Sequence, residues 1–196
     1  MSKDKGRIIS ITGPSGVGKG TLGVYAVATL PNCAVSVSAT TRPIRPTEVD
    51  GREYHFLTEE AFKGKIAGDG FIEWAKYGNN YYGTPYSSIE DLIADGKNVI
   101  IELEVQGALQ LMRKIPDVIS VFIMPPAPHL ITLRTRLEAR VAKTGESTDI
   151  EERLAIAKKE IAQAHHFERI IVNGDLERAK GIFVGYIAQQ LGISTI

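Results

Sequence analysis

Residues 11–21 read ITGPSGVGKGT and follow the apolar run RIISI at residues 7–11. Glycine tolerates unusual backbone angles and close approach of a ligand, so successive N–H groups of such a loop can point inward. A helix that starts at the end of the loop adds the partial positive charge of its N-terminus. The stretch therefore predicts a phosphate-binding loop between a strand and a helix, formed by Gly13, Pro14, Ser15, Gly16, Val17, Gly18, Lys19, Gly20 and Thr21.

Outward from this loop, short apolar and β-branched runs alternate with longer stretches of helical periodicity. The runs expected to form buried strands are residues 8–12, 34–37, 98–102, 118–124 and 169–173. The stretches expected to form helices are residues 19–30, 107–115, 129–140, 150–166 and 176–191. Strands that alternate with helices form parallel sheets, so the sequence predicts an α/β fold with a central parallel sheet of about five strands, flanked by helices.

Two intervals break the alternation. Residues 38–97 are rich in Gly, Tyr, Thr, Arg and Pro and offer no strand and crossover helix of the main sheet, so they predict an inserted lobe. Residues 141–149, VAKTGESTD, have no apolar face and join two helical segments, which is typical of a lid that closes over a substrate. The expected organisation is a single domain with a core of residues 1–37 and 98–196, a lobe of residues 38–97 and a short helical lid at residues 137–150 within the core segment.

Composition sets limits on partners. The 23 basic and 23 acidic side chains cancel, so no global field favours nucleic acid or an anionic membrane surface. Cys33 is the only cysteine, which excludes an internal disulfide and predicts a small buried side chain. The first residues lack the apolar segment of a signal peptide, and no stretch approaches a membrane span. We therefore expect a cytoplasmic protein whose anion sites are local.

The phosphate loop alone does not settle the activity, because GTPases, motors, pumps and kinases share it. No guanine-reading N-K-x-D motif of a switch GTPase occurs in the chain. Lys19 supplies a full charge for the β and γ phosphates of a nucleotide. Gly20 stands where many loops place a serine or threonine on Mg²⁺, and a loop reading GKGT is similar to a variant found in nucleoside monophosphate kinases.

Four further segments in the lobe carry a family resemblance. They are SATTRPIR at residues 38–45, DGREYHF at residues 50–56, FIEWA at residues 71–75 and YYGT at residues 81–84. Together with GPSGVGKGT, they make the chain resemble guanylate kinase over nearly its whole length. The resemblance implies a P-loop NTPase fold with a GMP-binding lobe, and transfer of the γ-phosphoryl group of ATP to GMP or dGMP.

The residue chemistry of the lobe fits that acceptor. Arg42 and Arg45 lie three apart in a proline-stiffened loop and can grip a phosphate with planar donor groups. Guanine presents donors at N1 and N2, so a carboxylate such as Glu73 can accept from both, whereas adenine would leave this carboxylate unpaired. Tyr54 and Tyr82 can add hydroxyl donors to the phosphate, and Ser38 and Thr84 can serve O6 and the remaining edge of the base.

Two alternations along extended segments bear on the site. Tyr81 and Tyr82 point to opposite faces of a strand, so only one of them should face the ligand, and the family pattern selects Tyr82. Glu102 and Glu104, in IIELEVQG, share a face at a strand end, where many guanylate kinases have aspartates. The resemblance implies that Glu104 lies on the GMP side and Glu102 near the metal and phosphates.

The helices around the expected lid carry arginines. Arg136 and Arg140 lie on one helical face, and Arg153 returns in the next helix. The family places arginines at these points, and the resemblance implies that they stabilise the transferred group. The connecting segment VAKTGESTD is longer than the family's common GTETEE. Asn173 resembles the asparagine of the family's VNDDL segment near the adenine. The cations expected to act in catalysis are thus Lys19, Arg42, Arg136, Arg140 and Arg153.

The metal should come with ATP. Because Gly20 has no hydroxyl, we expect Mg²⁺ to be held by ATP phosphate oxygens and by waters that Thr21 and Glu102 orient.

Two other functions stay open at this point. An interaction module that binds peptides and has lost catalysis would share most motifs, although the intact phosphate loop weighs against it. A kinase for another phosphorylated acceptor, such as a ribose bisphosphate, would share the loop but not need Ser38, Glu73 and Thr84. The sequence leaves monomer and homodimer equally possible.

Overall fold

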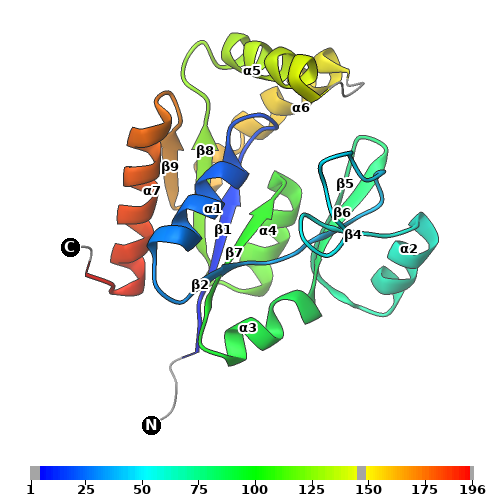
Figure 1. Ribbon diagram of the computed structural model, residues 1–196, viewed down its shortest axis with the longest axis vertical. Helices are drawn as coiled ribbons and strands as arrows, with labels where there is room; N and C mark the ends of the chain where they lie inside the picture. The colour runs from blue at the N-terminus through cyan, green and yellow to red at the C-terminus, as the bar shows by residue number, and fades with distance from the viewer. Residues whose placement is uncertain (1–4, 145–148, 195–196) are drawn as a thin grey trace. The chain divides into compact units, whose positions relative to one another are not determined.

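The computed structural model describes residues 5–144 and 149–194, and most of its helices and strands are labelled in Figure 1. Its strands are β1 (Ile8–Thr12), β2 (Cys33–Val35), β3 (Ala39–Thr40), β4 (His55–Phe56), β5 (Phe71–Tyr77), β6 (Asn80–Pro85), β7 (Asn98–Leu103), β8 (Ile119–Met124) and β9 (Arg169–Val172). Its helices are α1 (Lys19–Thr29), α2 (Glu59–Ala67), α3 (Glu90–Ala94), α4 (Val105–Lys114), α5 (His129–Thr144), α6 (Ile150–Ile161) and α7 (Leu176–Leu191), with 3₁₀ turns η1 (Tyr86–Ser88) and η2 (Ala164–His166).

The strands form two sheets within the described residues. The larger sheet has five strands in the order β2-β7-β1-β8-β9, and both β2 with β7 and β8 with β9 pair in parallel. The smaller sheet has four strands in the order β4-β3-β6-β5, and it includes the antiparallel pair β5 and β6. The predicted α/β fold with a central parallel sheet flanked by helices is confirmed, and residues 38–97 add no strand to the larger sheet.

Contacts divide the chain into two compact units. Unit 1 comprises Met1–Ser10 and Asn32–Val118, and unit 2 comprises Ile11–Pro31 and Ile119–Ile196. Unit 1 holds the smaller sheet with α2, α3 and α4, whereas unit 2 holds the glycine-rich loop with α1, α5, α6 and α7. The two candidate binding regions described below therefore belong to different units.

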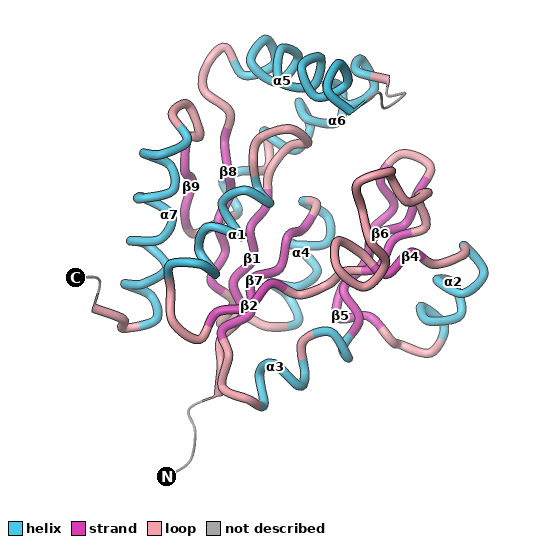
Figure 2. The backbone as a smooth tube through the Cα atoms, viewed as in Figure 1, coloured by secondary structure: helices cyan, strands magenta, loops and turns pink. Residues whose placement is uncertain are grey.

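Each unit has its own apolar packing. In unit 1, helix α2 lies beside the strands of the smaller sheet (Figure 2). Phe62 of α2 stacks on Phe71 of β5 at a centroid distance of 4.4 Å, and Ala39 of β3 belongs to the same buried cluster. In unit 2, β8 is buried along Ile119–Ile123, which is the burial expected of an inner parallel strand.

Local signals explain several helix ends. The side chains of Thr58 and Asp175 accept hydrogen bonds from the backbone of the first turns of α2 and α7, as N-cap residues do. Gly192 ends α7 in the left-handed conformation that glycine adopts readily. In the described part of the chain, no helix combines the length and the apolar character that a membrane crossing requires.

The structure corrects one boundary of the expected lid. Val141–Thr144, predicted as part of an irregular connection, continue α5 for one more turn. None of these four residues breaks a helix, and Ala142 and Lys143 favour one, so the missing apolar face did not stop the helix. Residues 145–148 of the predicted lid lie outside the described residues.

Two other helix boundaries also differ from expectation. Helix α4 begins at Val105, two residues earlier than predicted, which places Gly107 inside its first turn. Helix α6 ends at Ile161 instead of continuing to residue 166, and η2 follows it.

Candidate active site

The glycine-rich loop in unit 2 has the backbone that a phosphate site requires. Gly13, Gly16 and Gly18 adopt φ angles of 146°, 82° and 100°, which side-chain-bearing residues rarely adopt. A Cβ atom at Gly13 would lie 2.4 Å from the carbonyl oxygen of Ile123, so no other residue fits there. Gly18 caps α1, and the loop therefore ends at the positive end of that helix.

Lys19 folds back over this loop. Its Nζ donates a hydrogen bond to the carbonyl oxygen of Gly13 at 2.6 Å, and the residue is only 6% exposed. A buried ammonium beside the helix N-terminus concentrates positive charge where phosphate oxygens would bind. Gly20 and Thr21 follow in the first turn of α1, and both are exposed.

Two of the predicted residues donate hydrogen bonds to the backbone of the loop. Asn173, which is buried, donates from Nδ2 to the carbonyl oxygen of Val17 at 2.8 Å. Arg136 donates to the same oxygen at 3.5 Å and to the backbone oxygen of Asn173 at 2.7 Å. In this structure both side chains thus contact the backbone of the loop, a contact that the sequence did not predict.

The other arginines of unit 2 lie on α5 and α6. Arg153 donates to Oγ of Ser15 at 2.7 Å, which joins α6 to the phosphate loop. Arg140 lies on α5, one turn after Arg136, and is half-buried. The sequence analysis missed a bidentate ion pair between Arg134 and Glu151, with N···O distances of 2.5 and 2.9 Å, which links these two helices.

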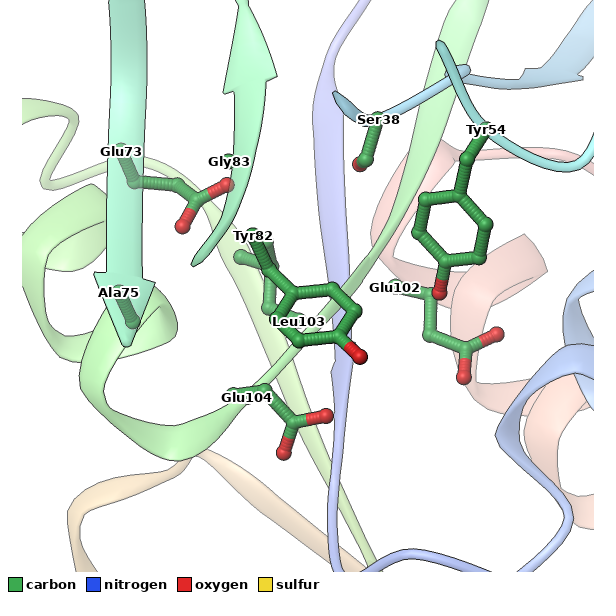
Figure 3. A pocket seen from close by; sticks show the side chains of 9 residues that line it. All are labelled: Ser38, Tyr54, Glu73, Ala75, Tyr82, Gly83, Glu102, Leu103 and Glu104. Carbon is green, nitrogen blue, oxygen red and sulfur yellow. The ribbon is translucent and has the colours of Figure 1, made fainter. Parts of the chain in front are cut away.

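A pocket in unit 1 brings together residues from distant parts of the chain, as Figure 3 shows. The predicted residues Ser38, Tyr54, Glu73, Tyr82, Glu102 and Glu104 all line it, together with Ala75, Gly83 and Leu103. They come from the segment before β3, the segment before β4, strands β5, β6 and β7, and the residue that caps α4.

Hydroxyl groups hold the carboxyl group of Glu73 on one side of this pocket. Thr84 donates to Oε1 of Glu73 at 2.7 Å, and Ser38 lies 3.1 Å from the Thr84 hydroxyl. Burial raises the pKa of Glu73 to about 7 and Glu104 adds to this rise, although the hydrogen bonds from Thr84 act against it. A carboxyl group kept this dry gains strongly from a ligand that donates hydrogen bonds to it.

The predicted phosphate-gripping arginines already have a carboxylate partner, Glu48. Glu48 accepts from both terminal nitrogens of Arg42, at 2.6 and 2.5 Å, and from the backbone and side chain of Arg45. Burial acts to raise the pKa of Glu48, but the hydrogen bond and charge of Arg42 outweigh it and lower the pKa. The sequence analysis missed Glu48, although an acidic residue three positions after Arg45 was a signal for this pairing.

Aromatic rings surround the same guanidinium group. The Arg42 guanidinium carbon lies 5.2 Å from the centroid of Tyr54 and 5.4 Å from that of Phe56. Tyr54 meets Tyr82 edge to face, and burial raises the pKa of the Tyr54 hydroxyl, which therefore stays protonated as a donor. Tyr81, on the other face of β6, stacks on Phe62 away from the pocket.

The two acidic residues after the third predicted strand differ in their surroundings. Glu102, within β7, is exposed on the pocket side, and its carboxylate and that of Glu104 lie in the same part of Figure 3 as the Tyr54 and Tyr82 hydroxyls. Glu104 caps α4, and its Oε2 is buried without a hydrogen-bond partner among the described residues. A buried acceptor of this kind calls for a donor from a ligand.

Oxygen ligands for a metal are sparse. In residues 5–144 and 149–194, no three or more His, Cys, Asp or Glu side chains gather in a way that could hold a metal ion. Thr21 and Glu102 both present exposed oxygen atoms, the donor type that Mg²⁺ prefers. Their chemistry fits a metal that reaches the protein on its nucleotide.

A nucleotide-phosphate loop and a pocket with buried donors and acceptors define a P-loop kinase that acts on a small phosphorylated molecule. The family model described as guanylate kinase matches residues 5–189, so the chain belongs to the guanylate kinase family. A guanylate kinase of Thermosynechococcus vestitus is 49% identical over 174 residues, 89% of each chain, and one of Synechocystis is 43% identical over 186 residues, 95% of each chain. The crystal structure of guanylate kinase from Anaplasma phagocytophilum superimposes with a TM-score of 0.75 at 30% identity, covering 97% of this chain and 89% of that one.

Proposed function

We propose that the protein transfers the γ-phosphoryl group of ATP to GMP or dGMP, giving ADP and the corresponding diphosphate. Family membership supports the reaction class, and the hydrogen-bonded chain from Ser38 through Thr84 to the buried carboxyl group of Glu73 carries the choice of acceptor. These three side chains offer hydrogen-bond acceptors to the N1–H and 2-amino groups of a guanine. Adenine has neither of these donors.

Guanine recognition follows from the geometry around Glu73. Ionised Glu73 would accept from N1–H and from the 2-amino group of guanine, while Thr84 and Ser38 serve the adjoining edge of the base. The unpartnered Oε2 of Glu104 would accept from a further donor of the nucleotide. An adenine would leave these buried acceptors unpaired, which costs on the order of 1–3 kcal/mol for each group.

The acceptor phosphate belongs with Arg42, Arg45, Tyr54 and Tyr82. Glu48 holds one edge of the Arg42 guanidinium, so the remaining N–H groups are oriented before a phosphate arrives. Orientation in advance lowers the entropy lost on binding. The negative charge of Glu48 also offsets part of the positive charge of Arg42 and Arg45. A dianionic phosphate would take over part of the hydrogen bonds that these arginines donate to Glu48.

The ATP phosphates would bind the loop of residues 13–21, with Lys19 moving from the Gly13 carbonyl oxygen to the β and γ phosphates. Transfer between two phosphates needs in-line positioning and neutralisation of charge on the equatorial oxygens more than it needs a general base. We assign the neutralisation to Lys19, Arg42, Arg136, Arg140 and Arg153, and the adenine side to Asn173.

Mg²⁺ bound with ATP would supply positive charge that neutralises the phosphates. The residues that would orient its waters are Thr21 in α1 and Glu102 in β7. We further propose that residues 38–97 act as the acceptor lobe and residues 137–150 as a lid that excludes water.

A coupled assay of ADP formation tests the proposal. We expect turnover with GMP and dGMP and at least 100-fold lower efficiency with AMP and with ribose 5-phosphate, because both leave the base-reading acceptors unpaired. Equal efficiency with GMP and AMP would remove the guanine assignment. The absence of ADP formation with every acceptor would instead favour the interaction module.

A further inference from the structure

Helix α4 lies directly against the carboxyl group of Glu73. A Cβ atom built on Gly107, in the first turn of this helix, would lie 2.2 Å from Oε2 and 3.1 Å from Cδ of Glu73. Contacts below 3.0 Å are essentially never made by real Cβ atoms. Gly107 therefore leaves the space that the Glu73 carboxyl group occupies.

The backbone of Gly107 does not itself require glycine. Gly107 does not have a positive φ angle, unlike Gly13, Gly16 and Gly18, and it lies within a regular helix. Glycine inside a helix is unfavourable relative to alanine, because it loses more conformational freedom on folding. The contact with Glu73 is thus the physical reason that the structure supplies for a glycine at this position.

A second residue of the same helix fixes the strand that carries Glu73. Strand β5 lies at the edge of the smaller sheet, so its outer backbone groups have no neighbouring strand. Gln110 fills this place at Trp74: its Nε2 donates to the Trp74 carbonyl oxygen at 2.7 Å, and its Oε1 accepts from the Trp74 N–H at 3.4 Å. Lys114, one turn further, donates to the carbonyl oxygen of Phe71 at 3.4 Å.

The geometry points to Gly107 and Gln110 as positioning residues that set the guanine selectivity of this kinase through Glu73. Gln110 fixes the position of β5 relative to α4. Gly107 leaves room for Oε2 of Glu73 against the helix, while Thr84 donates a hydrogen bond to Oε1. This inference rests on the proposed function, since it concerns the same base-reading carboxylate. Any side chain at 107 would push that carboxylate away from α4 and change what it can reach.

Kinetics of Gly107→Ala test the selectivity role. We expect KM for GMP to rise at least tenfold, with kcat and KM for ATP within about twofold of the parent, because only the base contact moves. The preference for GMP over inosine monophosphate, which lacks the 2-amino group, should shrink. Gln110→Met, which keeps the length but removes both hydrogen bonds, should change the same two quantities less.

Gly64→Ala is the matched control. Gly64 also lies inside a helix of unit 1, and a Cβ atom there would meet nothing within 4 Å. Its KM for GMP should match that of the parent. Isothermal titration calorimetry gives GMP affinity independently of turnover.

Thermal unfolding tests the contact without any substrate. Gly107→Ala should lower the Tm, whereas Gly64→Ala should raise it, as removal of a helical glycine does. In a Glu73→Asp background the carboxyl group retracts by one methylene, so the loss caused by Gly107→Ala should disappear. The same loss in both backgrounds would show that Gly107 does not act through Glu73.

The outcomes separate this inference from the proposed function. An active parent with an unchanged KM and GMP preference in Gly107→Ala would overturn the inference and leave the kinase assignment intact. A parent that does not phosphorylate GMP would overturn both the assignment and the selectivity role, and the unfolding cycle would then decide only whether Gly107 positions Glu73.

Discussion

The two binding regions of this protein are built in opposite ways. We propose that the loop of residues 13–21 in unit 2 binds phosphate through backbone N–H groups and one lysine; its shape depends on glycines at 13, 16 and 18. The acceptor pocket of unit 1 uses side chains from five separate segments between Ser38 and Glu104. Backbone donors serve any phosphate, whereas a set of buried side chains distinguishes one base from another.

The regions also differ in the partners and the protonation of their ionisable side chains. In the loop, the Nζ of Lys19 donates a hydrogen bond to the backbone carbonyl oxygen of Gly13. In unit 1, Arg42, which packs against the pocket residue Tyr54, is paired with Glu48, and the buried Glu73 of the pocket holds a proton near neutral pH. Changes in the loop should therefore affect every acceptor alike, while changes in the pocket should affect guanine nucleotides selectively.

Lys19→Met should give the largest effect. We expect kcat to fall by roughly 10³-fold or more with every acceptor, because the lysine neutralises charge that develops during transfer. The Tm should change little. Lys159→Met, at an exposed position of α6, is the control and should retain full activity. A Lys19→Met enzyme that keeps its turnover would contradict the phosphate-loop assignment.

The pH dependence of stability should reveal the state of Glu73. Its pKa is about 7 in the folded protein and near 4.5 when unfolded, so the folded state binds more protons between these values. The stabilising contribution is therefore complete below pH 4.5 and is lost as the pH rises through 7. Denaturation at pH 5 to 8 should show up to about 3 kcal/mol less pH dependence in Glu73→Gln than in the parent. Parallel curves would place the pKa of Glu73 near its ordinary value.

Arg140→Ala should lower kcat by roughly 50-fold with GMP while affinity for GMP alone stays nearly constant, because an arginine on the lid helix acts mainly in the closed, charged state. Arg134→Ala on the same helix removes an exposed ion pair and should cost little. Isothermal titration calorimetry measures GMP affinity in both variants. An equal fall in affinity and turnover would move Arg140 to the acceptor site.

Glu73→Gln should reduce kcat/KM for GMP by more than ~1.5 kcal/mol, at least tenfold, because an amide cannot accept from both guanine donors. The weak activity with AMP should not fall. Steady-state kinetics with both acceptors provide the measurement. If GMP efficiency is unchanged, Glu73 does not read the base, and the contrast between a general loop and a selective pocket fails.

Glu102→Gln should give the smallest effect. If Glu102 orients waters on Mg²⁺, the Mg²⁺ concentration for half-maximal activity should rise on the order of three- to tenfold, with GMP affinity nearly unchanged. A Mg²⁺ titration compares the variant with the parent at saturating ATP and GMP. Identical titration curves would remove Glu102 from the metal site.

Local sequence was sufficient for much of the fold. Strand β1 and helices α1 and α7 begin at the predicted residues, since the apolar periodicity and the cap residues that specify them lie within a few positions. The predicted end of α5 at residue 140 was wrong, because residues 141–144 continue the helix although they lack an apolar face. The predicted start of α4 at Gly107 was also wrong, because the helix begins at Val105 and Gly107 lies inside its first turn.

The sequence by itself determined the backbone of the glycine-rich loop, because the positive φ angles of Gly13, Gly16 and Gly18 are angles that glycine adopts readily. It also supplied the residue types of the acceptor pocket. Only the tertiary structure decided how those residues meet. Glu48 accepts hydrogen bonds from Arg42, Asn173 and Arg136 donate to the Val17 carbonyl oxygen, and Gly107 leaves room for the Glu73 carboxyl group. The contact of Asn173 with Val17 joins positions 156 residues apart, which no local pattern encodes, whereas Glu48 lies only 6 residues from Arg42, within reach of a local signal.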